Sequence, residues 1–166
     1  MKKLLVVYYS WSNGNTKTIA EQLCKAANGD IAVIDTAEPY KGSYNDVVDR
    51  GQREVEEGFM PKLKPLGVDI SQYDVIAIGT PTWWYTMAPA VLTFLNDNDF
   101  KGKTVIPFMT NGGWSGHVIK DMKKLCKGAD IVLEKEITFD SEGGSNMQTP
   151  QSEVNEWIKN VKDFCC

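Results

Sequence analysis

The chain has 166 residues, a net charge of −4 and a pI near 5.1. This length suits a single domain over residues 1–166 that buries a full hydrophobic core. The acidic charge argues against nucleic acid as a partner, and no apolar run is long enough to span a membrane. The apolar run after Met1 is also too short for a signal peptide, so we expect a cytoplasmic protein.

Apolar runs and amphipathic segments alternate along the chain. The apolar runs predict strands over 4–9, 31–34, 75–79, 104–109 and 131–133, the last with 137–139 as a continuation. The amphipathic segments predict helices over 16–27, within 44–57, over 89–96 and about 115–127, and from 149–150 to the C-terminus. This alternation predicts an α/β fold with a doubly wound five-stranded parallel sheet, order 2-1-3-4-5, and helices on both faces.

The loop between the first strand and the first helix is rich in hydroxyl and amide groups. Its residues are Ser10, Trp11, Ser12, Asn13, Gly14, Asn15 and Thr16. Backbone N–H groups at a helix N-terminus attract anions, and these side chains can donate further hydrogen bonds to phosphate oxygens. The lysine of nucleotide-hydrolase loops and the three glycines of dinucleotide loops are absent. The loop therefore predicts a phosphate site, with an ordinary helix N-cap as the alternative.

Two more loops follow the third and fourth strands, at the same edge of the predicted sheet. Their candidate site residues are Pro81, Thr82, Trp83, Trp84, Tyr85, Thr110, Asn111, Gly112, Gly113, Trp114 and Gly116. Flat ligands stack on Trp and Tyr rings, and backbone in glycine-containing loops can read the edge of a heterocycle. Two aromatic loops beside a phosphate site predict a planar aromatic ligand; aromatic packing at the sheet edge is the alternative.

These two loops contain no Asp, Glu, Lys or Arg. His117 is their one candidate for acid–base chemistry, and a plain surface histidine in the first turn of a helix is the simpler interpretation. We therefore expect no catalytic residue and no metal site, but a ligand with its own reactivity, as a redox cofactor has. Cys165 and Cys166 end the chain, where we expect a frayed tail with two exposed thiols.

These motifs together resemble the flavodoxin family over nearly the whole chain. The resemblance rests on the Ser-x-Ser-Asn-Gly-Asn-Thr loop at 10–16 and on segments 73–84 and 102–113. Residues 44–61 also resemble an insert found in one flavodoxin-like branch. The resemblance implies bound FMN, with its phosphate on 10–16 and its isoalloxazine ring between the two later loops.

The resemblance further implies a small electron-transfer protein, a monomer or weak dimer, that shuttles low-potential electrons between redox partner proteins. The loop over 81–89 also resembles FMN-dependent NAD(P)H:quinone or flavin reductases of the same fold, which is the alternative function. A flavin-free interaction module is a third reading. Because neighbours in an extended loop alternate, we expect Trp83 and Tyr85 on one side and Trp84, the closest ring contact, on the other.

Overall fold

The computed structural model describes residues 1–11, 13–142 and 144–166. Its centre is a parallel sheet in the order β2-β1-β3-β5-β6, which confirms the predicted topology. The strands on this path are β1 (Leu4–Tyr8), β2 (Asp30–Val33), β3 (Val75–Trp83), β5 (Thr104–Asn111) and β6 (Asp130–Ile131). Strands are added on one side of β1 first and then on the other, from β3 onward. This switch leaves a crevice beyond the carboxyl ends of β1 and β3, where such sheets bind ligands.

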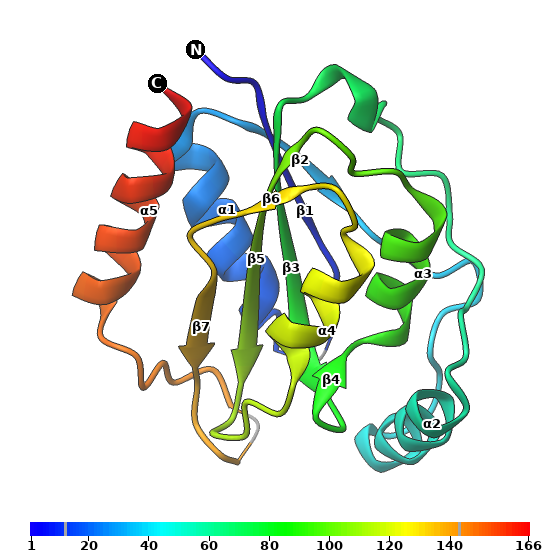
Figure 1. The fold of residues 1–166 in the computed structure, drawn as a ribbon. Coiled ribbons are helices and arrows are strands. Elements are labelled where there is room, and N and C mark those ends of the chain that lie inside the picture. Colours follow the sequence, from blue (N-terminus) through cyan, green and yellow to red (C-terminus); the bar gives the residue numbers. More distant parts are fainter. Residues whose placement is uncertain (12, 143) are drawn as a thin grey trace.

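Four helices cover the two faces of the sheet (Figure 1). One face carries α1 (Asn15–Ala27) and α5 (Gln151–Cys165), and the other carries α3 (Pro89–Asp97) and α4 (Val118–Leu125). The N- and C-termini lie together at the end of the sheet opposite the carboxyl ends of the strands. A short 3-10 helix, Ile70–Gln72, precedes β3. Within the described residues, none of the helices has the length and apolar character needed to cross a membrane.

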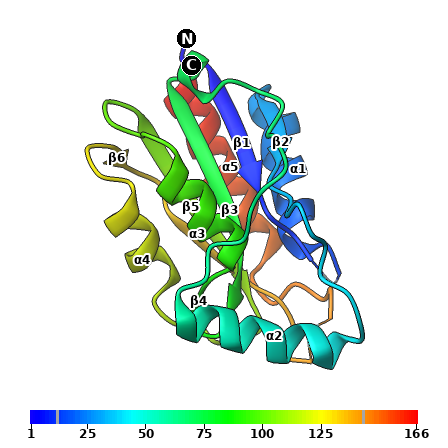
Figure 2. The ribbon, with the colours of Figure 1, turned by 90° about the vertical axis from the view of Figure 1, so that its right-hand side faces the viewer.

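The remaining helix, α2 (Tyr44–Glu57), lies across the carboxyl-end edge of the sheet instead of on a face (Figure 2). Its first turn is closed by a capping box, in which Ser43 Oγ accepts from the Asp46 N–H and the Asp46 carboxylate accepts from the Ser43 N–H. Gly58 ends the helix in the left-handed conformation. These two signals explain why the helix fills the whole range within which the sequence predicts it.

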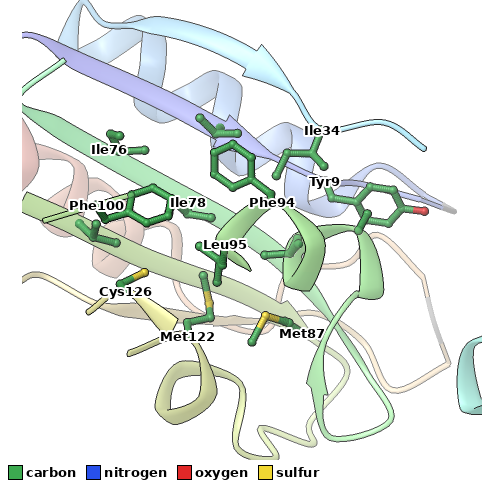
Figure 3. Packing of buried hydrophobic residues seen from close by; sticks show 14 of the residues in the cluster. Tyr9, Ile34, Ile76, Ile78, Met87, Phe94, Leu95, Phe100, Met122 and Cys126 are labelled. Carbon is green, nitrogen blue, oxygen red and sulfur yellow. The ribbon is translucent and has the colours of Figure 1, made fainter. Parts of the chain in front are cut away.

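The core consists of two apolar layers, because successive strand residues point to opposite faces. On one side, Ile76 and Ile78 of β3 pack with Phe94 and Leu95 of α3 and with Met122 of α4, as Figure 3 shows. The opposite layer joins the alternate strand residues to α1 and α5. Both faces of the central strands are therefore covered, and the edge where the strands end is the part of the sheet that remains open to a ligand.

The third strand is longer than predicted and turns back on itself. β3 runs on to Trp83 and pairs with the antiparallel strand β4 (Thr86–Met87), with Thr82 opposite Met87 and Trp83 opposite Thr86. Trp84 and Tyr85 form the two-residue tip, with φ of 49° and 71°. Two positive φ angles are typical of a type I′ hairpin. The expected extended loop, with alternating side chains, is therefore wrong.

Three smaller predictions also need correction. The fifth sheet position holds two short strands, β6 and β7 (Lys135–Thr138), because Leu133 between them has a φ of 52° and breaks the pairing. Helix α4 begins at Val118, so His117 is its N-cap and not a residue of the first turn. Helix α5 extends to Cys165, which is buried, so Cys166 alone is an exposed thiol at this end.

Candidate functional site

A cavity of about 440 Å³ opens at the carboxyl ends of β1, β3 and β5. It brings together most residues of the three predicted loops. Those that line it are Trp11, Asn13, Asn15, Thr16, Pro81, Thr82, Trp83, Trp84, Thr110, Asn111, Gly112 and Trp114. Of the other candidates, Ser10, Gly14, Tyr85, Gly113 and Gly116 do not line it, and Ser12 lies outside the described residues.

One end of the cavity is formed by the N-terminus of α1. Gly14 caps the helix in the left-handed conformation, at φ 73°, and a side chain there would meet nothing within 4 Å. The first N–H groups of a helix have no partner within the helix, and the helix dipole adds positive potential there. This end of the cavity is therefore suited to an anion.

Thr16 joins this end to β5. Its hydroxyl is buried and lies 2.8 Å from the Thr110 hydroxyl, so each oxygen already has one partner. Each can still accept another hydrogen bond, and one of the two can donate to a second group. Asn15 donates from Nδ2 to the Gly144 carbonyl at 3.0 Å, which ties the loop after β7 to the phosphate-type loop.

Only one charged side chain, Asp140, is among the described residues that line the cavity. The Gly144 N–H donates to its carboxylate at 2.7 Å, and this hydrogen bond lowers the pKa of Asp140 below the usual 3.8. The nearby Lys17 is exposed and lies 3.9 Å from Glu21. An anion at the helix end would thus be bound by N–H and O–H dipoles, with no lysine or arginine from the described lining.

An aromatic wall closes the side of the cavity toward α2. The Trp83 ring meets Tyr9 and Tyr40 edge-on, with centroids 5.9 and 5.2 Å away, and the Trp11 ring at 6.4 Å. Trp11 in turn stacks on Tyr44 of α2 at 5.8 Å. Trp83 is therefore turned toward the body of the protein, as expected, while it keeps one edge on the cavity.

Beside this wall lies a polar network around the buried Glu54. The carboxylate of Glu54 accepts from Tyr40 Oη and from Arg50 Nε, each at 2.7 Å. Burial, followed by the hydrogen bond to Glu54, raises the pKa of Tyr40. Gly51 lets α2 pack closely here, because a Cβ there would lie 3.1 Å from the Trp83 ring. The network holds α2 against the aromatic wall.

The hairpin tip presents Trp84 and Tyr85 at the mouth of the cavity. The Trp84 indole N–H donates to the Val48 carbonyl at 2.9 Å, and the Tyr85 carbonyl accepts from the His117 N–H at 2.7 Å. A Cβ on Gly116 would lie 2.1 Å from the Tyr85 carbonyl oxygen, so only glycine fits there. Tyr85 lines a second hollow of about 200 Å³ next to the first, together with Trp84 and Trp114.

His117 is exposed and lies outside the main cavity. Its Nδ1 contacts the Asp121 carboxylate, which also accepts from Thr86 Oγ1 at 2.6 Å. The Thr86–Asp121 hydrogen bond thus links β4 to α4, and the imidazole contacts the same carboxylate from the N-cap of α4. Within the described part of the chain, no group of His, Cys, Asp and Glu side chains could hold a metal ion.

Two further segments contribute to the cavity that the sequence reasoning did not include. Helix α2 supplies Tyr44, Val47, Val48 and Gly51, and the segment after β7 supplies Phe139, Asp140 and Gly144. The capping signals of α2 give its bounds but not the surface that it covers. A glycine in mid-helix, at Gly51, was the one sequence signal of a close approach there.

The structure is that of a doubly wound α/β protein with a cavity at the carboxyl edge of its sheet. A family model described as Flavodoxin matches residues 3–161, so the chain belongs to the flavodoxin family. Among curated proteins, none matches the chain significantly.

Solved structures agree with this family. A protein of Bacteroides eggerthii, provisionally assigned as a flavoprotein, is 28% identical with a TM-score of 0.76, over 97% of this chain and 98% of that one. A protein of Bacteroides uniformis with the same provisional assignment is 28% identical with a TM-score of 0.77, over 95% of this chain and 98% of that one. A Lactobacillus acidophilus flavoprotein, solved in complex with FMN, is 22% identical with a TM-score of 0.70, over 95% of this chain and 99% of that one.

Proposed function

We propose that the protein binds FMN in this cavity and acts as an electron-transfer flavoprotein. The observation that carries the proposal is that one cavity joins the N-terminus of α1 to the Trp84 and Trp114 rings. A volume of about 440 Å³ lies within the roughly 300–1,000 Å³ of small-molecule sites. The Lactobacillus acidophilus flavoprotein, which has the same fold, was solved with FMN.

In this proposal the chain binds and orients the cofactor, and FMN supplies the redox chemistry when it is bound. The α1 N-terminus, Asn13, Asn15 and Thr16 would hold the phosphate, while the aromatic rings and Gly112 would hold the flavin ring. A lining without lysine or arginine, among the described residues, would offer little stabilisation to a negatively charged reduced ring. The electrons would pass to and from redox partner proteins at the open edge.

The first test is the absorbance spectrum of the purified protein. We expect a flavin spectrum with about one FMN per chain, because the fold carries a single phosphate-type loop. Release of the cofactor by acid, followed by chromatography, identifies it as FMN, FAD or riboflavin. Protein that neither carries flavin nor takes up added FMN would overturn the proposal.

A second candidate function is FMN-dependent reduction of a quinone or flavin by NAD(P)H. The observation that favours it is the additional hollow of about 200 Å³ beside the ring end of the main cavity. Its described lining is uncharged, and includes Trp84, Tyr85 and Trp114. Steady-state assays with NADH or NADPH and a quinone separate the two functions, because an electron carrier shows no rapid turnover with these small molecules.

A further inference from the structure

Glu136 lies on β7, outside the three loops that form the cavity. One oxygen of its carboxylate, Oε1, accepts from Asn111 Nδ2 at 2.9 Å and also from the Ser115 hydroxyl. Asn111 is the last residue of β5, and Ser115 belongs to the loop that follows it. The neighbouring Ile137 is fully buried in the core, so the backbone that carries Glu136 is fixed. One carboxylate oxygen on β7 thus bonds both to the end of β5 and to the loop that follows it.

The Asn111 side chain also bonds to the backbone of the loop that follows β5. Its Oδ1 accepts from the Gly113 N–H at 2.8 Å, while its Nδ2 faces Glu136. A carboxylate can only accept, so it determines which end of the amide faces which partner. Glu136 therefore fixes Asn111, and through Asn111 the backbone at Gly113. The side chains of Asn111 and Trp114, with Gly112 between them, line the ring end of the cavity.

We propose that Glu136 is a positioning residue for the ring end of the flavin site, and that its charge also lowers the reduction potential of the bound flavin. The inference rests on the proposed function for its ligand. The first part follows from the hydrogen bonds, which keep Gly112 and Trp114 in the orientation that meets a flat ring. The second follows because a fixed negative charge disfavours a further negative charge nearby, although solvent at the exposed side weakens this effect.

Two substitutions separate the hydrogen bonds from the charge. Glu136→Gln keeps an oxygen that can accept from Asn111 and Ser115 but removes the charge, whereas Glu136→Ala removes both. The matched control is Glu134→Ala, which removes a carboxylate two residues away that is paired with Lys123 at 2.6 Å. Because its partner is Lys123 and not Asn111 or Ser115, Glu134 reports the general effect of losing a carboxylate near β7.

The first measurement uses the protein without flavin. In Glu136→Ala, amide hydrogen exchange at Gly113 should speed up, while Glu136→Gln and Glu134→Ala should exchange like the wild type. The second measurement is affinity. Glu136→Ala should weaken FMN and riboflavin by the same factor, about tenfold for a lost restraint of this size, because the loop contacts the ring and not the phosphate.

The third measurement is the reduction potential of the FMN-loaded protein, which a purely structural role would not move in Glu136→Gln. We expect it to rise in Glu136→Gln and to stay unchanged in Glu134→Ala. Unchanged exchange and affinity in Glu136→Ala would overturn the positioning role, and an unchanged potential in Glu136→Gln would overturn the charge effect. Failure of the wild type to bind either flavin would instead overturn the proposed function.

Discussion

Trp84 and Tyr85 occupy backbone conformations that large side chains rarely adopt. Both have positive φ, at 49° and 71°, where Asn and Gly are the usual residues of such a turn. Strain of this kind persists only where the surroundings enforce it, and here the Val48 carbonyl and the His117 N–H do so. The strain turns two aromatic rings outward at the mouth of the cavity.

Gly116 provides the space for this turn, which gives a prediction about stability. Gly116→Ala should lower the free energy of unfolding by about 2–4 kcal/mol, because it adds a backbone clash to an unfavourable φ of 55°. The control is Gly58→Ala, where φ is 65° and nothing lies within 4 Å, so strain alone should cost about 1–2 kcal/mol. Urea denaturation measures both. Equal losses would show that the close approach to Tyr85 is absent.

Trp84 should be the ring that matters most to bound flavin. Trp84→Ala should weaken oxidised FMN by about 1–3 kcal/mol, the range for a lost stacked aromatic. It should also raise the reduction potential, since an electron-rich ring disfavours a negatively charged reduced flavin. Trp84→Phe keeps a ring but loses the indole N–H that donates to the Val48 carbonyl. Its FMN affinity and reduction potential should lie between those of the wild type and Trp84→Ala. Fluorescence titration and potentiometry give both quantities; unchanged values in Trp84→Ala would exclude this placement.

At the scale of elements, the sequence predicts the position of helix α2 along the chain but not that the helix lines the cavity. Ser43 and Gly58 signal its ends locally, so its bounds follow from the sequence. Its buried stripe is Val47, Gly51 and Glu54, and an apolar pattern does not include the last two. Glu54 is buried with Tyr40 and Arg50 bonded to it. Arg50 lies four residues before it on the same helix, but the contact with Tyr40 becomes visible only when the chain is folded.

The β3–β4 hairpin could not be predicted for a related reason. A two-residue hairpin is normally signalled by Asn-Gly or Asp-Gly, and here Trp84-Tyr85 takes that place. The break between β6 and β7 was equally hidden, since Leu133 is an ordinary strand residue. Its carbonyl accepts from the Trp157 indole N–H at 2.6 Å, a contact across 24 residues of sequence. By contrast, strand order follows from the alternation of strands and helices alone.

The capping box of α2 gives a prediction that links this element to the site. Ser43→Ala should cost about 0.5–2 kcal/mol of stability, the usual value for a lost N-cap. Because Tyr44, Val47 and Val48 lie just inside this end and line the cavity, FMN and riboflavin should both bind more weakly. Circular dichroism melting and flavin titration test this. Normal flavin affinity in a destabilised variant would show that α2 does not close the binding site.

At the scale of the whole molecule, the four cysteines report how tightly the fold is closed. Burial raises the pKa of Cys126 to about 11, and burial also raises the pKa of Cys24 and of Cys165. Cys166 is exposed. The thiolate is the reactive form. At about pH 8, near the usual thiol pKa, a thiol reagent should therefore modify Cys166 quickly and the other three cysteines slowly.

In denaturant the same reagent should modify all four cysteines of the sequence at similar rates. Cys166→Ser should abolish the fast phase in the native protein and leave the slow ones unchanged. A second fast thiol in the native wild type that Cys165→Ser removes would mean that the end of α5 frays and exposes Cys165.

The most direct test of the central claim is a calorimetric titration of flavin-free protein with FMN and with riboflavin, in the wild type and in Thr16→Val. The account predicts that FMN binds more tightly than riboflavin, because only FMN reaches the α1 N-terminus. Thr16→Val, which removes one buried hydroxyl at that end, should weaken FMN by about 1.5–3 kcal/mol and riboflavin much less. Equal binding of the two flavins, or equal losses in the variant, would contradict the assignment of this loop to the phosphate.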